Sequence, residues 1–238
     1  MAFFYGGMVS EGNVITVMMQ SFVAMGVISL WWWLIGFSLC FGASGQVIGN
    51  PGTYVALTNL GPLDPWTQTN NGPIALYTTT TMGISGYVFC MFQLTFAIIT
   101  PTLITGSFAE RLRFKPYVIF LVLWASFVYA PFAHLAWGGG LFAQWGVWDF
   151  AGGTVVHMTS GWSALGAIIV LGKRHKVEET EEKPHNVPFI LLGTSILWFG
   201  WFGFNGGSAL QSNGTASAAY INSQLAAALA TQLLKPLL

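Results

Sequence analysis

Charge is scarce in this sequence. Only 7% of the 238 residues are Asp, Glu, Lys or Arg, whereas 54% are hydrophobic. Soluble domains carry roughly 25% charged residues, so this composition excludes an ordinary soluble domain and predicts that lipid surrounds the chain. Eight basic residues balance eight acidic ones. We find no basic patch of the kind that nucleic-acid binding requires, and no nucleic-acid partner is expected.

Residue clusters that carry enzyme chemistry are also missing. The two cysteines, Cys40 and Cys90, lie inside apolar runs and have no metal-binding spacing, so neither a disulfide nor a metal site can be inferred. The sequence offers no nucleophile–base pair and no phosphate-binding glycine loop, which gives a membrane enzyme little support. We therefore expect no metal, no organic cofactor and no enzymatic activity.

Long apolar stretches are what the chain has instead. Residues 1–9 are too short to span a bilayer and are interpreted as the end of a first helix. Stretches close to the ~20 residues that a bilayer requires follow at about 13–40, 74–105, 116–137, 149–172, 187–208 and 217–238. The sequence predicts an all-α polytopic membrane protein with about six full spans plus the end of a first helix.

The basic residues predict the orientation of these spans. They fall in two loops separated by two spans and at the far end of the last stretch: Arg111, Arg113, Lys115, Lys173, Arg174, Lys176, Lys183 and Lys235. An even number of crossings puts all of them on one side, which the positive-inside rule makes cytoplasmic. The loop from Lys173 to Asn186 is then cytoplasmic, and Asp64 and Asp149 lie on the outer side.

The stretch from Asp149 to His157 opens the fourth span. An aspartate at a helix start accepts hydrogen bonds from backbone N–H groups, here those of Ala151 or Gly152, and a fixed anion there could also help to hold a cation. His157 lies eight residues further on, about 12 Å along a helix. A histidine at this depth is costly and usually marks a pathway. We favour a pore-lining partner or proton relay over a neutral histidine between packed helices.

Aromatic residues recur at helical spacing in two other spans. The second span carries Phe89, Phe92, Gln93 and Phe96 on one face, a pattern that by itself indicates helix packing. The fifth span carries Trp201, Phe204 and Ser208. Because the two spans run in opposite directions, Phe96 and Phe204 are expected to meet one turn deeper than Phe92 and Ser208. Trp137, at the outer end of the third span, could complete an outer aromatic site.

Such a site favours a small cation, which ring faces and a hydroxyl can hold. A constriction lined by phenylalanine offers a bare ion no compensation for lost water. Ammonium differs from potassium because it can release a proton and pass as ammonia, with an imidazole below as hydrogen-bond partner. Composition alone does not select ammonium over other small cations.

A short repeat suggests two inverted halves. Phe4-Tyr5-Gly6-Gly7 resembles Phe204-Asn205-Gly206-Gly207, and the predicted topology makes the two helices run in opposite directions. An inverted-repeat transporter has this arrangement, although four matching residues can also arise by chance.

Several motifs resemble those of the ammonium transporter family. The stretch Asp149–His157, followed by Ser160-Gly161 and by Gly172-Lys173-Arg174, is similar to the signature of that family. Four more segments match in the same order along the chain: Phe3–Gly7, Met91–Arg111, His134–Gly140 and Gly200–Asn205. The resemblance covers nearly all of residues 1–238 as one ammonium transporter domain.

The resemblance implies a role for each matching residue. Trp137, Phe92 and Ser208 correspond to the outer ammonium recruitment site, and Phe96 and Phe204 to a stacked phenylalanine gate. His157 corresponds to the first of two paired pore histidines and Trp201 to an aromatic pore wall. Asp149 corresponds to an acidic residue that transport needs but that lies outside the conduction path. Trp137 favours the ammonium/methylammonium permease branch over the Rh branch.

The resemblance also implies partners and a location. It implies a homotrimer in the plasma membrane with one pore per subunit, and a PII-type regulatory protein on the Lys173–Asn186 loop, although such a charged loop is more often only a solvated face. Family members have about eleven spans, and the second pore histidine comes from the second half. We therefore interpret the chain as an N-terminal fragment that does not close a pore by itself. The alternative function is an ammonium sensor built on the same scaffold and coupled to a signalling module.

Overall fold

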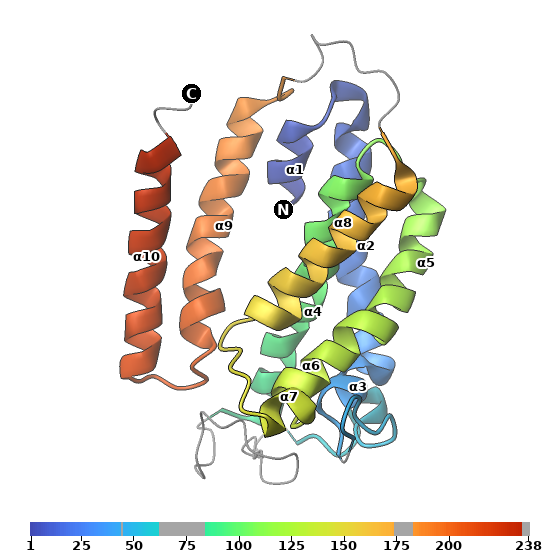
Figure 1. The fold of residues 1–238 in the computed structure, drawn as a ribbon, viewed down its shortest axis with the longest axis vertical. Helices are drawn as coiled ribbons and strands as arrows, with labels where there is room; N and C mark the ends of the chain where they lie inside the picture. The colour runs from blue at the N-terminus through green and yellow to red at the C-terminus, as the bar shows by residue number, and fades with distance from the viewer. Residues whose placement is uncertain (44, 62–83, 174–182, 235–238) are drawn as a thin grey trace.

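The chain folds as a bundle of helices (Figure 1). This structure is a computed structural model, and it describes residues 1–43, 45–61, 84–173 and 183–234. The helices run as follows: α1 Ala2–Met8, α2 Val14–Trp31, α3 Phe37–Phe41, α4 Gly86–Phe108, α5 Phe114–Trp124, α6 Ala130–Trp137, α7 Leu141–Gln144, α8 Thr159–Leu171, α9 Val187–Gly207 and α10 Gly214–Leu234.

Three of these helices continue through a π-helical turn. The turns cover Trp32–Gly36 between α2 and α3, Ala125–Tyr129 between α5 and α6, and Gly153–Met158 before α8. Short 3₁₀ turns lie at Glu11–Asn13 and Val55–Leu57. The π turns join neighbouring segments into longer rods, so that α2 and α3 together form one span, as do α5 and α6.

Five helical segments in the described residues are long and apolar enough to cross a membrane: Glu11–Phe41, Gly86–Phe108, Phe114–Gln144, Gly153–Leu171 and Val187–Gly207. The predicted all-helical membrane fold is therefore confirmed. The predicted sixth span is a helix of spanning length, α10, but it is not among these five. Its polar residues lower its apolar character, among them Asn222, Ser223 and Gln224.

The second span begins later than predicted. We expected it from about residue 74, but the residues up to 83 lie outside the described part of the chain, and helix α4 begins at Gly86. Ser85 is its N-cap, because the Ser85 hydroxyl accepts a hydrogen bond from the Val88 N–H at 3.3 Å. The Ser85 hydroxyl satisfies a backbone N–H at the start of the helix. The pattern of apolar residues does not indicate this start.

The two basic loops meet at one end of the bundle. The guanidinium of Arg111, just after α4, donates hydrogen bonds to the carbonyl oxygens of Ser107 and of Gly172, which ends α8. Figure 1 shows both helix ends at the top. This end is called the basic end below and the opposite one the Trp137 end. The even number of crossings between the loops is confirmed, whereas Asp64, Arg174, Lys176 and Lys235 lie outside the described residues.

Helices α1 and α9 pack closely and run in opposite directions (Figure 1). The N–H of Asn186, the N-cap of α9, donates to the carbonyl of Gly7 near the end of α1 at 3.0 Å. Further along, Gly193 lies against Phe4, so closely that a Cβ on Gly193 would be 2.4 Å from the Phe4 backbone nitrogen. The antiparallel relation expected for the two repeat motifs is confirmed.

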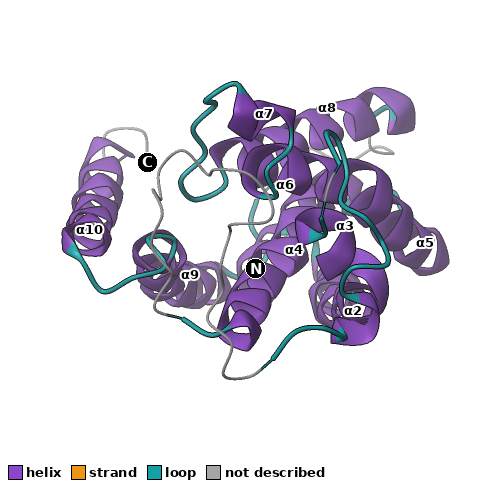
Figure 2. Ribbon diagram, turned by 90° about the horizontal axis from the view of Figure 1, so that it is seen from below, coloured by secondary structure: helices purple, strands orange, loops and turns teal. Residues whose placement is uncertain are grey.

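The core lies among α2 to α8, with α9 and α10 to one side (Figure 2). Rings of Trp32, Phe37, Phe41 and Phe89 pack edge to face or tilted there, with centroids 5.0 to 6.3 Å apart. Phe89 therefore belongs to the core, as the packing interpretation of its stripe predicted. Helix α10 packs along α9, for example through the stacked rings of Phe202 and Tyr220 at 4.2 Å.

The close approach of α1 and α9 is testable. In Gly193→Ala the added methyl group would overlap the backbone of Phe4, so we expect destabilisation by roughly 1–3 kcal/mol, measured as a lower thermal midpoint of the full-length protein in detergent. Gly200→Ala on the same helix is the matched control, because a Cβ there meets no atom within 4 Å. Equal midpoints for the two variants would contradict this packing.

Candidate functional site

The carboxylate of Asp149 caps the helical segment that carries His157. Oδ1 accepts hydrogen bonds from the N–H groups of Gly152 at 2.6 Å and Gly153 at 2.9 Å. Oδ2 accepts from Thr154 at 2.8 Å and Val155 at 2.9 Å. The predicted capping role is confirmed with Gly152 as a donor. Both oxygens are occupied by N–H groups at the positive end of a helix, where an anion is favoured.

The helix itself begins at Gly153 rather than at Asp149. Gly152 precedes it with φ +99°, a left-handed conformation that a residue with a Cβ adopts only with strain. The carbonyl of Gly152 accepts from the N–H groups of both Val156 and His157 at 2.9 Å, which gives the first turn its π character. His157 is therefore only four residues into the helix, about 6 Å or less of rise, not the expected depth.

Trp137 links the end of α6 to the Asp149 cap. Its indole N–H donates to the Asp149 carbonyl oxygen at 2.9 Å. The side chain is only 6% exposed, and its ring lies 5.5 Å, edge to face, from the ring of Phe96 on α4. One residue, Asp149, thus holds Trp137 through its carbonyl and the helix of His157 through its carboxylate.

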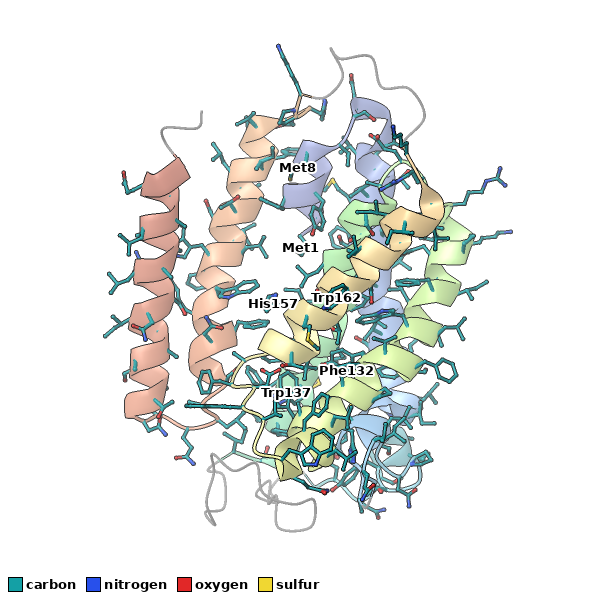
Figure 3. The ribbon with its side chains drawn as sticks, in the orientation of Figure 1. Met1, Met8, Phe132, Trp137, His157 and Trp162 are labelled. Atoms are coloured by element: carbon teal, nitrogen blue, oxygen red, sulfur yellow. The ribbon has the colours of Figure 1, made fainter. Side chains whose placement is uncertain are left out.

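The rings of four helical segments form a continuous row. From Trp137 the row passes to Phe96, then to Phe204 on α9 at 4.4 Å, then to Trp201 at 4.6 Å, and ends at the imidazole of His157 at 6.0 Å. Figure 3 shows His157 projecting from its helix toward α9, with Trp137 nearer the lower end of the bundle. We call these five side chains the aromatic row.

The predicted meeting of Phe96 and Phe204 is present, with a difference in geometry. The two rings are tilted by 41° rather than stacked. The stacked pair is Trp201 and Phe204, one turn apart on α9, with an interplanar angle of 14°. The helical spacing placed both rings on one face, but it contained no information on their relative tilt.

Phe92 and Ser208 lie at the Trp137 end of the row. The ring of Phe92 is 4.9 Å from Phe96, edge to face. On its other side it faces the end of α9, where a Cβ on Gly207 would be 3.0 Å from Phe92 Cε2. Ser208 follows Gly207 directly, and its hydroxyl donates to the carbonyl of Phe204 at 2.8 Å.

One buried polar residue next to this site was given no role from the sequence. His134 lies one turn before Trp137 and is 1% exposed, and both of its ring nitrogens lie near backbone carbonyl oxygens. A histidine in an apolar run was the available signal in the sequence.

Within the described residues, no group of three His, Cys, Asp or Glu side chains is arranged to hold a metal ion.

Comparison with known proteins identifies the family of this chain. The sequence profile of the Ammonium Transporter Family matches residues 1–234. The chain belongs to this family. The family is one of transporters and not a class of enzymes.

The similarity to individual family members extends along nearly the whole chain. An ammonium transporter of Bacillus subtilis (strain 168) is 45% identical over 228 residues, which cover 96% of this chain and 52% of the relative. The crystal structure of Candida albicans Mep2 matches with a TM-score of 0.79 and 33% identity over 95% of this chain and 48% of that one. A structure titled Sensor Amt Protein matches with the same TM-score and identity, over 95% and 54%. The chain thus spans about half the length of these relatives.

The Asp149 cap can be tested by hydrogen exchange. Asp149→Asn offers one acceptor oxygen and an NH₂ group that cannot accept, so we expect the amides of residues 152–155 to lose protection and the domain to lose about 1–2 kcal/mol of stability. Mass spectrometry of the full-length protein measures the exchange. Asn213→Ala is the matched control, because Asn213 caps α10 through the Ala216 N–H at 3.0 Å. Unchanged exchange at 152–155 in Asp149→Asn would refute the cap.

Proposed function

We propose that the whole protein moves ammonium across a membrane, releasing a proton at the Trp137 end and conducting ammonia along the aromatic row to His157. The observation that carries this proposal is the unbroken contact sequence Trp137–Phe96–Phe204–Trp201–His157 across four helical segments. Membership of a transporter family supports it. The route runs from one end of the bundle to an ionisable group inside a membrane-spanning segment.

In this proposal Trp137, Phe92 and Ser208 recruit the cation. Ring faces attract a cation electrostatically, and the Ser208 oxygen can accept one N–H hydrogen bond. Ammonium and methylammonium both carry N–H donors and a single charge, whereas potassium carries no donor. The hydroxyl therefore adds a preference that aromatic rings alone do not provide.

Phe96 and Phe204 form the gate of the proposed path. Phe96 is 1% exposed and in contact with Phe92, Trp137 and Phe204, so no polar atom of these four side chains except the bonded indole N–H can replace the hydration shell of an ion. An ion without compensating hydrogen bonds faces a large desolvation barrier. Neutral ammonia has a much smaller barrier, and this difference excludes metal cations.

His157 and Trp201 line the path beyond the gate. The imidazole lies 6.0 Å from the Trp201 ring and 6.3 Å from the Phe204 ring. A neutral imidazole has one nitrogen that accepts a hydrogen bond and one that donates, so it can hold ammonia or carry the released proton. Its placement at the end of the row supports a role in the path over one in packing.

Asp149 is proposed to act outside the path. Four backbone N–H groups occupy its two carboxylate oxygens, which leaves a poor ligand for a passing cation. Asp149 supports transport by holding the start of the His157 helix through its carboxylate and Trp137 through its backbone carbonyl. We therefore do not propose the direct cation-holding role that the sequence left open.

Transport is preferred over sensing as the function. The Bacillus subtilis relative is named a transporter. A structure titled Sensor Amt Protein matches this chain with the same TM-score and identity as the Candida albicans Mep2 structure. The fold therefore does not favour the sensor function over transport.

We further propose a homotrimer in the plasma membrane with the Lys173–Asn186 loop in the cytoplasm. The clustering of described basic residues at one end supports this orientation. Two further partners are proposed. A PII-type regulatory protein binds that loop, and membrane lipid contacts the apolar faces of the helices. The mass of the full-length protein in detergent tests the trimer.

Uptake experiments test the recruitment site. Trp137→Leu removes the ring that contacts Phe96 and the indole N–H that reaches Asp149. We expect the KM for methylammonium uptake by cells that express the full-length protein to rise roughly tenfold, as the loss of a cation–π contact and a hydrogen bond predicts. Trp162→Leu is the matched control because Trp162 is 69% exposed. Equal KM values for Trp137→Leu and wild type would exclude Trp137 from recruitment.

Ion leakage tests the gate. Phe204→Ala removes the ring between Phe96 and Trp201, so water can enter and the barrier to ions falls. We expect potassium flux into proteoliposomes of the full-length protein to rise at least about tenfold. Phe199→Ala on the same helix, 76% exposed, should leave the flux unchanged. A Phe204→Ala protein that still excludes potassium would argue against a gate at this position.

A further inference from the structure

His134 is a buried histidine close to the aromatic row, 1% exposed, and it has no role in the path proposed above. Its Nδ1 lies 3.0 Å from the carbonyl oxygen of Cys40, and its Nε2 lies 2.8 Å from that of Gly45. Cys40 belongs to α3, and Gly45 belongs to the loop that follows α3. Both ring nitrogens of this α6 side chain therefore lie against backbone carbonyls of a different part of the chain, and a neutral ring donates to one of them.

The backbone around His134 is packed just as tightly. A Cβ on Gly138 would lie 2.1 Å from the Cys40 oxygen and 2.5 Å from His134 Nδ1, and a Cβ on Gly140 would lie 2.6 Å from the Gln46 oxygen. The Leu141 N–H also donates to the Gln46 oxygen at 2.9 Å. Together these contacts form a seam between the end of α6 and the end of α3.

Trp137 lies inside this seam. It is the last residue of α6, three positions after His134, and Gly138 follows it directly. The Gly138 and Gly140 N–H groups both donate to the His134 carbonyl at 3.0 Å. The position of the indole therefore depends on where the seam holds the end of α6, besides the bond from the indole N–H to Asp149.

We propose that His134 is a positioning residue: its Nδ1–H donates to the Cys40 carbonyl and so fixes the end of α6 at the height at which Trp137 meets Phe96. This inference rests on the proposed function, because Trp137 is assigned to cation recruitment there. His134 itself does not touch the cation and acts through Trp137 alone.

Two conservative variants separate the two contacts. A neutral imidazole carries one N–H, and only an imidazolium carries two, so the contact that matters can be identified by supplying one donor at a time. The amide nitrogen of Asn in His134→Asn matches the reach of Nδ1 toward Cys40. The amide nitrogen of Gln in His134→Gln matches the reach of Nε2 toward Gly45. We expect Asn to restore most of the function lost in His134→Ala, and Gln to restore less.

Methylammonium uptake by full-length protein in proteoliposomes gives the test. We expect His134→Ala to raise KM roughly two- to tenfold, the factor that one buried hydrogen bond supplies, with little change in the maximal rate per folded protein. In a Trp137→Leu background the same substitution should raise KM no further, because contacting residues that act in one chain are non-additive. A general loss of folded protein would lower the maximal rate and leave KM alone.

Gly138→Ala approaches the seam from the backbone side and should raise KM like His134→Ala. Gly26→Ala in α2, where a Cβ meets no atom within 4 Å, is its control. An unchanged KM in His134→Ala, an equal rise in both backgrounds, or rescue by Gln but not by Asn would each overturn the inference.

A wild-type protein without saturable uptake would overturn the proposed function instead. Hydrogen exchange at residues 138–141 would then decide the role of His134 without transport. Faster exchange in His134→Ala than in His134→Asn supports the fastening of α6, and equal exchange in both refutes it.

Discussion

The carboxylate of Asp149 and the four N–H groups that it binds form the interaction on which the rest of the site depends. A helix start inside an apolar bundle leaves backbone donors unsatisfied, and one anion resolves this cost for the segment that carries His157. The carbonyl of the same residue fixes the Trp137 indole. Asp149 therefore positions the residues at both ends of the aromatic row, Trp137 and His157, although it does not belong to the row itself.

The two ends of the bundle are held by polar contacts of different kinds. At the basic end, Arg111 binds the carbonyl that ends α8, and the Glu110 carboxylate accepts from the hydroxyl and N–H of Ser10, before α2. At the Trp137 end, Asp149 and His134 bind backbone groups. Between them the helices meet through rings, closely packed glycines and side-chain hydrogen bonds such as that from the Trp124 indole to Ser163 Oγ at 2.8 Å. In a bilayer, where lipid is as apolar as leucine, such polar contacts and small residues carry the specificity of packing.

Much of this arrangement could be predicted from the sequence, because it depends on the spacing of residues along helices and on the distribution of charge. Asp149 as a cap, the span directions and the meeting of Phe96 with Phe204 follow from helical spacing and from the distribution of charge. The rest depends on local backbone choices. The left-handed Gly152, with φ +99°, moves the helix start four residues beyond Asp149, and the start of α4 at Gly86 does not follow from counting apolar residues.

The three π turns set the phase of the rods that contain them. Each turn holds one residue more than the α-helical repeat requires, and one residue corresponds to about 100° of rotation. The turns at Trp32–Gly36, Ala125–Tyr129 and Gly153–Met158 precede the segments that carry Cys40, Trp137 and Ser160. Removing a single residue from any of them would restore a regular helix and swing everything beyond it to another face. A change of length within these spans therefore displaces every side chain beyond it, whereas a substitution acts at one position.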